Sequence, residues 1–335
     1  MSLHTKTKSY VKRVFSALLI IILSFCVVSM VTASLFFHSF FPRMDTLPAY
    51  SMRYGDVDTS RYPCRQIRFS SGENMLTGYC YVCDDPVGLV VIAAGFGESG
   101  EAHLPEMMYF ADSGYDVFCY DGTGIGESDG SGTVGLSQPA LDLRSALDAV
   151  ADDSALHQLP IYLYGHSAGG YAAATCTDHP SVTAAVILSG FESPTMLMRE
   201  SAKKYVGILA DIEYPFLSLE NSLVFSGRGD ESASQCILEA EKPVAVFEGS
   251  DDGTIPESVR LSAFLSDSDN PDLSLTILSD PLHSGHSGLW LSDEALEYRS
   301  DSVDEAVDPQ MANDLDDAFM SGIVRFYQNS GHKLY

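Results

Sequence analysis

Apolar and polar positions alternate in short blocks along most of the chain. Several apolar runs have the length and continuity of strands buried on both faces, at 88–94, 116–120, 161–164, 182–189, 244–248 and 273–278. Two further segments, 65–70 and 75–83, predict a pair of strands joined by a short turn. Helical stretches separate several strands, such as the one from Ser137 to about Asp152. This alternation predicts an α/β domain whose mainly parallel sheet is covered by helices on both faces.

The alternation is interrupted once, at about 192–242. This stretch contains no strand-like run and is rich in methionine, aromatic and aliphatic residues. We predict a small helical insertion that forms a cap over one end of the sheet. The last helix is expected at 309–327, where Ala318, Ile323 and Phe326 can pack on the sheet.

The N-terminal part of the chain has a different pattern. Val14–Phe37 contains 24 residues without a charge, and about 20 apolar residues are enough to cross a bilayer core. Four basic residues precede this segment: Lys6, Lys8, Lys12 and Arg13. No acidic residue occurs before Asp45. Since positively charged flanks stay in the cytoplasm, the remainder of the chain is expected to face outward.

These patterns predict four parts of the chain. Residues 1–13 form a cytoplasmic basic N-terminus, 14–37 a transmembrane signal anchor, 38–62 a stalk, and 63–335 the folded domain. The predicted location is the cell membrane, with a single pass and an extracytoplasmic domain. The alternative is a cleaved signal peptide and secretion, because small residues near Ala33 offer a cleavage site.

Charge and cysteine content narrow the class of protein. The net charge of −27 repels phosphate backbones, so nucleic acid is not expected as a partner. Six cysteines lie outside the apolar segment, and an exported domain permits disulfides. Cys64 with Cys80 or Cys83 is the nearest plausible pairing. Nothing in the sequence specifies an oligomeric state.

The first candidate for chemistry is Gly165-His166-Ser167-Ala168-Gly169, a GxSxG sequence. It follows the buried strand at 161–164 and opens an alanine-rich helix. A sharp turn from strand to helix would expose the Ser167 hydroxyl at the end of the strand, beside the positive N-terminus of the helix. The two glycines leave room for that turn. The context therefore indicates a nucleophilic serine.

A serine nucleophile needs a base and a group that orients the base. His283 and His286 both follow the last strand, at the sheet edge where Ser167 is expected, and both remain candidates. Asp251 and Asp252 follow the strand at 244–248 at the same edge. The chain order Ser, Asp, His is that of one hydrolase fold.

The glycine-rich turn Ala94-Gly95-Phe96-Gly97 follows another strand. The backbone N–H groups of Phe96 and Ala168 are the expected oxyanion donors. No metal is predicted, because the HxxH pair at 283–286 has no third ligand to recommend it. A nucleotide cofactor is not predicted either, because the spacing of the glycines at 122–126 is one residue shorter than in a dinucleotide-binding motif.

From about residue 65 to 328 the chain resembles α/β-hydrolases of the serine aminopeptidase-like and monoacylglycerol lipase-like branch. Four motifs carry the likeness: the turn at 94–97, the D-x-x-G-x-G-x-S loop at 121–128, GHSAG, and Gly249-x-x-Asp252-x-x-Ile255-Pro256. The resemblance implies Asp252 rather than Asp251. It also favours His286 in Gly285-His286-Ser287-Gly288, although the distance from the last strand favours His283. Ala94 and Thr123 replace a His and an Arg that are common in the branch, which blurs the substrate class.

The resemblance implies a serine hydrolase that cleaves carboxylic esters through an acyl-enzyme, without a cofactor, and the apolar N-terminal segment predicts that it is anchored in the membrane. The expected catalytic residues are Ser167, Asp252 and His286, with His283 as the alternate base. The expected substrate is an acyl ester or a short peptide. The alternatives are an aminopeptidase-like enzyme, an acyltransferase, and a catalytically silent binding module on the same fold.

Overall fold

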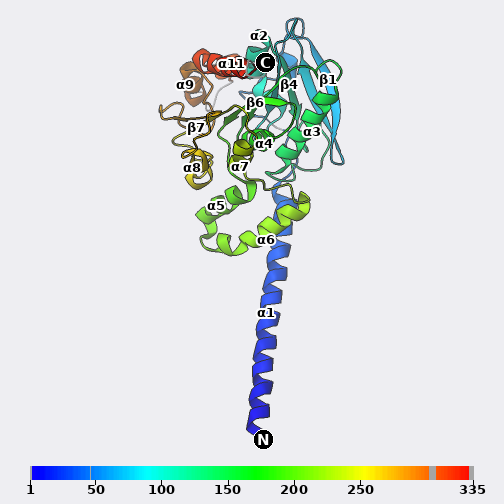
Figure 1. Cartoon of the computed structure of the whole chain (residues 1–335), viewed down its shortest axis with the longest axis vertical. Helices are drawn as coiled ribbons and strands as arrows, with labels where there is room; N and C mark the ends of the chain where they lie inside the picture. Colours follow the sequence, from blue (N-terminus) through cyan, green and yellow to red (C-terminus); the bar gives the residue numbers. More distant parts are fainter. Residues whose placement is uncertain (1, 46, 302–306, 332–335) are drawn as a thin grey trace.

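A computed structural model describes residues 2–45, 47–301 and 307–331 (Figure 1). Its described residues form one eight-stranded sheet with the order β1-β2-β4-β3-β5-β6-β7-β8. The strands are β1 (Cys64–Ser71), β2 (Asn74–Tyr81), β3 (Leu89–Ala93), β4 (Asp116–Asp121), β5 (Ile161–His166), β6 (Val182–Leu188), β7 (Val244–Gly249) and β8 (Leu273–Leu278). Only β2 runs antiparallel to its neighbours β1 and β4. The prediction of a mainly parallel sheet is confirmed.

Helices cover both faces of this sheet. The α-helices of the described residues are α1 (Ser2–Phe40), α2 (Leu104–Asp112), α3 (Gln138–Asp152), α4 (Ala168–Thr175), α5 (Pro194–Val206), α6 (Leu209–Val224), α7 (Ala233–Glu239), α8 (Ser262–Leu265), α9 (Asp293–Asp301), α10 (Pro309–Ala312) and α11 (Asp317–Gly331). One apolar core lies between the sheet and α3, α4 and α7, and a second lies between the sheet and α2 and α11. Because both faces are covered, every residue of β3, β4 and β5 is buried.

The expected last helix is broken into α10 and α11. The side-chain amide of Asn313 donates to the carbonyls of Tyr50 (2.5 Å) and Pro309 (2.7 Å). Leu315 forms a β-bridge with Leu291. These contacts hold the chain in an extended form between the two helices. Local periodicity indicates a continuous helix here, and long-range contacts interrupt it.

Helix α1 extends out of the domain (Figure 1). Its segment Tyr10–Phe40 is long and apolar enough to cross a membrane, and 6% of its most apolar window is buried. A signal sequence meets the same criterion of length and composition. The structure thus supplies an apolar helix that could anchor the chain.

The stretch 38–62, predicted as a stalk, packs in part on the folded domain. Met52, Val57 and Tyr62 are buried in the core on one face of the sheet. The guanidinium of Arg43 donates to the carbonyls of the 126–130 loop. Apolar side chains at intervals in a polar stretch explain the difference, because burying them fixes the segment on the domain.

The described cysteines carry free thiols. Cys64 lies opposite Tyr81 in the β1–β2 ladder, and Cys80 lies opposite Arg65. Alternate residues of a strand face opposite sides of the sheet, so Cys64 is exposed while Cys80 is buried. The sheet therefore keeps these two thiols apart.

Close packing of α4 on β3 leads to a first prediction. A Cβ on Gly169 would overlap the carbonyl oxygens of Ala93 and Ala94. We expect Gly169→Ala to lower the free energy of unfolding by about 3 kcal/mol or more, since backbone atoms would have to move. The measurement is urea unfolding followed by circular dichroism. Gly55→Ala is the matched control, because that position is open, and its change should stay below about 1 kcal/mol.

Candidate active site

Ser167 lies on a turn of one residue between β5 and α4. Its backbone has φ 54° and ψ −116°, a region that L-residues rarely adopt. Gly165 and Gly169 make the turn possible, because a Cβ on Gly165 would overlap the carbonyl of Gly169. The Ser167 N–H donates to the carbonyl of Leu188 on β6 at 2.9 Å. The turn is thus fixed from both sides, and the hydroxyl is held at the C-terminal end of β5.

A continuous hydrogen-bonded chain leads away from this hydroxyl. Ser167 Oγ lies 2.9 Å from His286 Nε2, and His286 Nδ1 lies 2.7 Å from Asp252 Oδ2. The other oxygen of Asp252 accepts from the N–H groups of Thr254 (2.8 Å) and Ile255 (2.9 Å). A carboxylate can only accept, so the proton of His286 lies on Nδ1 and its Nε2 lone pair faces Ser167.

The electrostatics keep Asp252 ionised. Burial acts to raise the pKa of this carboxyl, but the hydrogen bond and charge of His286 and the two backbone N–H groups lower it below its ordinary value. The side chain of Asp252 is 2% exposed. A buried, ionised carboxylate of this kind orients an imidazole and stabilises the imidazolium.

The two residues that the sequence offered as alternates lie elsewhere. His283 Nε2 lies 2.9 Å from Asp293 Oδ1, and His283 Nδ1 lies 3.3 Å from the carbonyl of Gly288. The side chain of Asp251 is exposed at the surface. The structure brings Ser167, Asp252 and His286 together and leaves His283 and Asp251 outside the hydrogen-bonded chain.

The two predicted oxyanion donors lie on turns that follow β3 and β5, two neighbouring parallel strands. The turn at 95–98 is closed by a hydrogen bond from the Glu98 N–H to the Gly95 carbonyl at 3.2 Å. That bond does not use the N–H of Phe96, which lies inside the turn. Ala168 is the first residue of α4, so its N–H has no acceptor within the helix. Both groups are therefore available to an oxygen placed beside Ser167.

His166 holds the loop that carries His286, a role that sequence reasoning missed. Its Nε2 donates to the carbonyl of His286 at 3.1 Å, and the hydroxyl of Ser189 donates to the same carbonyl at 2.8 Å. A carbonyl oxygen cannot donate, so the Nε2 of His166 carries a proton. The only sequence feature that could have indicated this role is the position of His166 inside GHSAG.

A buried polar cluster lies behind this loop. Potential ligand atoms of Glu98, His103 and His166 lie within 4.8 Å of one another. His103 Nδ1 lies 2.8 Å from Glu106, and its buried Nε2 has no hydrogen-bond partner. Two imidazoles and a carboxylate are groups that can hold a metal ion. They also form a charge network, in which burial raises the pKa of Glu98 but His166, His103 and the Gly95 N–H lower it to about 2.

The motif loop after β4 has a supporting role. Asp121 accepts from the N–H groups of Gly100 and Glu127, and Ser128 donates to the Asp121 carbonyl at 2.6 Å. Thr123, which stands where an Arg is common, binds Asp142 through its N–H at 2.7 Å. These contacts tie the 121–128 loop to Gly100, which follows the turn at 95–98, and to Asp142 of α3.

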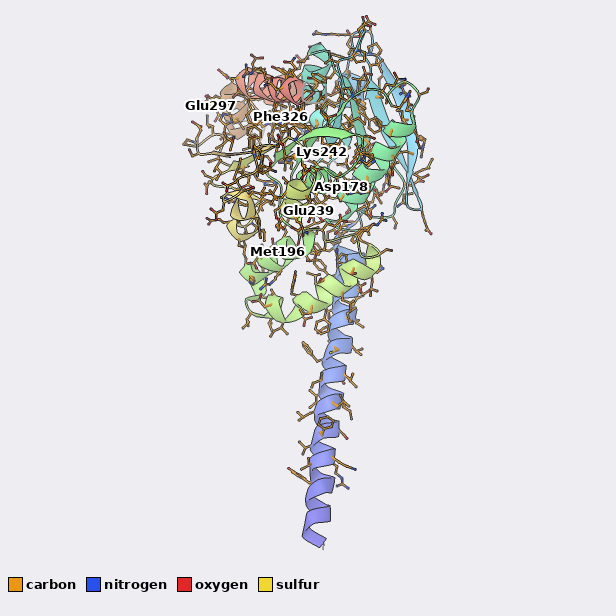
Figure 2. All side chains as sticks on the ribbon, viewed as in Figure 1. Asp178, Met196, Glu239, Lys242, Glu297 and Phe326 are labelled. Carbon is orange, nitrogen blue, oxygen red and sulfur yellow. The ribbon has the colours of Figure 1, made fainter. Side chains whose placement is uncertain are left out.

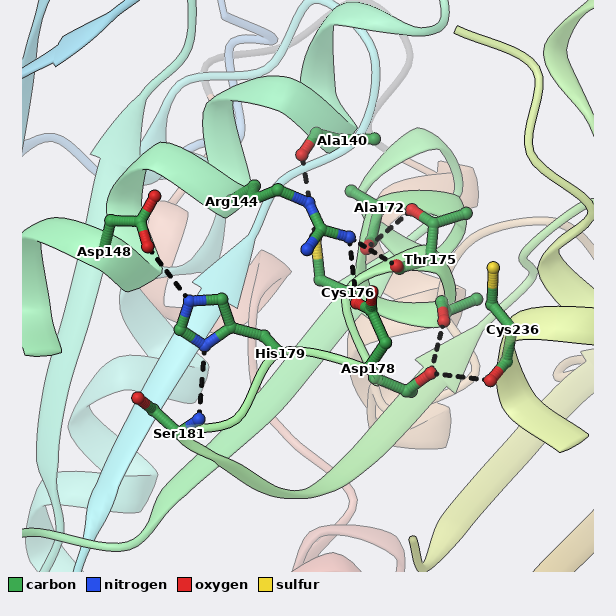
Figure 3. A network of polar contacts seen from close by, with 12 residues as sticks. Ala140, Arg144, Asp148, Ala172, Thr175, Cys176, Asp178, His179, Ser181 and Cys236 are labelled. Carbon is green, nitrogen blue, oxygen red and sulfur yellow. Dashed lines mark hydrogen bonds and ion pairs between the residues drawn. The ribbon is translucent and has the colours of Figure 1, made fainter. Parts of the chain in front are cut away.

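The ring of His179 is hydrogen-bonded in a separate network outside this site. Figure 3 shows the ring of His179 between Asp148 and the N–H of Ser181, at 3.2 and 3.3 Å. In the same network Arg144 donates to Asp178 at 2.9 Å. These contacts tie α3 to the segment that follows α4 and precedes β6.

A mainly parallel sheet with a strand–serine–helix turn at the end of β5 defines the α/β-hydrolase fold. Residues 84–225 match the family model described as serine aminopeptidase, S33. The match spans the turn at 95–98, the 121–128 loop and GHSAG. It confirms the resemblance that these motifs suggested.

Solved structures show the same fold at low sequence identity. An esterase of Pyrococcus furiosus has 17% identity over 86% of this chain and 98% of its own, with a TM-score of 0.56. An α/β-hydrolase of Vibrio vulnificus has 15% identity over 86% and 88%, with a TM-score of 0.56. Acetyl xylan esterase 1 of a Thermoanaerobacterium species has 15% identity over 70% and 81%, with a TM-score of 0.53. No curated protein matches the chain.

The charge of Glu98 leads to a second prediction. A lowered pKa means that ionised Glu98 contributes stability above its ordinary value of 4.5, and that this contribution is lost as the pH falls toward about 2. We therefore expect Glu98→Gln to destabilise the protein at pH 6, and the difference from wild type to shrink between about pH 4.5 and 2. Denaturant unfolding at a series of pH values measures it. Glu297→Gln, at an exposed position of α9, is the control; an equal pH dependence in both variants would contradict the prediction.

Proposed function

We propose that this protein is a membrane-anchored, extracytoplasmic serine hydrolase that cleaves carboxylic esters. The observation that carries the proposal is the hydrogen-bonded chain from Ser167 through His286 to Asp252. Its serine lies on a strained turn at the N-terminus of α4, where the Ala168 N–H has no acceptor within the helix. This arrangement has the parts that acyl transfer requires: a nucleophile, a base, an orienting carboxylate and oxyanion donors.

The proposed reaction proceeds in two halves. His286 Nε2 removes the proton from Ser167 Oγ, which attacks the carbonyl carbon of the ester, and the N–H groups of Phe96 and Ala168 stabilise the oxyanion. The tetrahedral intermediate collapses, and the leaving alkoxide takes the proton from His286 and departs as an alcohol. His286 then deprotonates a water that attacks the acyl-enzyme. The acid is released, and the proton returns to Ser167.

Apolar surroundings support an ester with an acyl group. Phe37, Phe41, Met198 and Phe225 form a buried cluster against which Phe96 packs. Phe96 carries one of the two proposed oxyanion donors, so an apolar surface lies next to the reacting carbonyl. Such a surface favours an acyl chain over a charged peptide terminus.

The matched family model favours a second candidate, an aminopeptidase-like reaction with the same acyl-enzyme. An aminopeptidase needs a carboxylate free to bind the substrate amine. Glu98 accepts from the Gly95 N–H and faces His166, and Glu192 accepts from Ser232 and the Ser234 N–H. Since these nearby carboxylates already have partners, esters are the preferred substrates.

Helix α1 and its flanks support the proposed anchoring. Lys12 and Arg13 precede the apolar segment, and 6% of its most apolar window is buried by the domain. Leaving so many apolar side chains in water is unfavourable, and a bilayer removes that cost. Positive flanks at the N-terminal side orient the domain away from the cytoplasm.

The histidine assignment supplies a third prediction. Ser167→Ala and His286→Gln should each lower kcat for p-nitrophenyl butyrate by about 10⁴-fold or more, because each removes a reacting group. His283→Gln is the matched control and should stay within about threefold of wild type. A fluorophosphonate probe should label wild type and His283→Gln, and should not label Ser167→Ala.

Other outcomes would point to the alternatives. A loss of activity in His283→Gln with none in His286→Gln would reverse the assignment. A folded wild-type protein that neither reacts with the probe nor cleaves esters or aminoacyl amides would sink the enzyme proposal in favour of a binding module. Ester products formed with added alcohols would identify an acyltransferase.

A further inference from the structure

The hairpin of α5 and α6 exposes an apolar stripe. Tyr205 is 88% exposed, Ile208 74%, Leu219 50% and Leu223 65%. Leu209, Ile212, Leu219 and Leu223 follow one another along α6 at intervals that place them on one face. A contiguous apolar surface of this kind marks a site of interaction with an apolar partner.

The stripe lies beside the proposed anchor. Figure 1 shows α6 crossing α1, on the side of the domain from which α1 extends. The Ser29 hydroxyl donates to Glu213 at 3.0 Å, and the rings of Phe25 and Phe216 meet edge to face at 5.8 Å. Figure 2 shows side chains that project to both sides of α1 where the helix extends away from the domain.

Helix geometry places this contact at the depth of a bilayer. Phe25 lies about 18 Å and Phe36 about 35 Å along the helix from Arg13. A bilayer core is about 30 Å thick. With Arg13 at the cytoplasmic boundary, the part of α1 that contacts α6 runs from the outer half of the core to its outer surface. The exposed stripe is then in contact with acyl chains.

The charges of the hairpin are compatible with this position. Asp211 pairs with Arg199 at 2.6 Å and with Lys203 at 3.1 Å, and Glu220 is buried against the domain. Paired or buried charges avoid most of the cost of contact with lipid. Lys204 is exposed at the end of α5, where its long side chain can reach phosphate headgroups.

A cavity of about 430 Å³ lies between the hairpin and the anchor. Thr32, Ala33 and Phe36 of α1 line it, together with Met198, Ala202 and Leu217 of the hairpin. This volume is typical of ligand sites, which span about 300–1,000 Å³. The walls are mainly apolar, so an alkyl chain is the complementary ligand.

Aromatic contacts lead from this cavity to the candidate active site. Phe36, which lines the cavity, meets Phe41 edge to face at 5.8 Å, and Phe41 meets Phe96 at 5.7 Å. Phe96 carries a proposed oxyanion donor. An alkyl chain that starts in the cavity and follows these rings would bring its carbonyl toward Ser167.

We propose that the α5–α6 hairpin lies in the outer leaflet beside α1, and that the cavity between them receives an acyl chain of a bilayer lipid. The substrate is then an acyl ester that resides in the membrane. This inference rests on the proposed anchoring and ester hydrolysis. It adds an acyl-binding site that α1 and the α5–α6 hairpin form together.

Tryptophan quenching tests the position of the hairpin. The full chain is placed in phosphatidylcholine–phosphatidylglycerol nanodiscs with brominated acyl chains, which quench nearby tryptophan. Wild type, with its single Trp290, gives the baseline. We expect Leu219→Trp to add fluorescence that is quenched at least as much as that of Leu19→Trp in the anchor. Val87→Trp, exposed just before β3, is the control and should not be quenched.

The same series separates the possible failures. Quenching at Leu19→Trp without quenching at Leu219→Trp would place the anchor in the bilayer and the hairpin outside it, which overturns this inference alone. No quenching at either position would overturn the anchoring proposal and this inference with it. Fluorophosphonate labelling of the same samples reports separately on the proposed hydrolase.

Filling the cavity tests its ligand. Ala202→Trp places an indole among the lining residues. We expect the ratio of kcat/KM for a palmitoyl ester to that for a butyryl ester to fall at least tenfold, because only the longer chain reaches the cavity. Ala318→Trp, at an exposed position of α11, is the control and should keep the wild-type ratio. An unchanged ratio in Ala202→Trp, with fluorophosphonate labelling intact, would overturn the assignment of the cavity.

Discussion

The turn at Ser167 is the constraint on which the candidate site depends. A strand becomes a helix within one residue there, and the backbone adopts a conformation that costs free energy. The cost is tolerated because α4 packs directly on the neighbouring strands through Gly165 and Gly169, where a side chain would overlap backbone atoms. The same close packing aims the hydroxyl outward at the end of β5. The strained backbone of Ser167 is therefore maintained by the tight packing of α4 beneath it.

Polar groups around this turn are held by partners from distant parts of the chain. His286 is oriented by Asp252 through its ring and by His166 and Ser189 through its carbonyl. Asp252 in turn accepts from two N–H groups of its own loop. In a chain with a net charge of −27, a buried carboxylate needs such donors to remain ionised. The cluster of Glu98, His103 and His166 continues the same network behind the loop.

The N-terminal segment is coupled to the domain more closely than a flexible tether would be. Arg43 binds carbonyls of the 126–130 loop, and Phe41 packs against Phe96 beside the proposed oxyanion site. The segment that follows α1 therefore contributes side chains to the surroundings of the site. A domain fixed in this way keeps one orientation relative to α1, as the proposed anchoring and the proposed lipid substrate require.

The sequence by itself determined the α/β architecture and the candidate serine. Short apolar runs predict the buried strands, and glycines within two residues of Ser167 predict the GHSAG turn. Both features can be predicted because they depend on residues that are close together in the sequence. Only the tertiary structure showed which of His283 and His286 is hydrogen-bonded to Ser167, because His283 is paired with Asp293 and His286 with Asp252. Tertiary contacts also interrupt the predicted last helix and hold residues 41–62 against the domain. Contacts between groups far apart in the chain depend on strand order and loop path, which local periodicity does not encode.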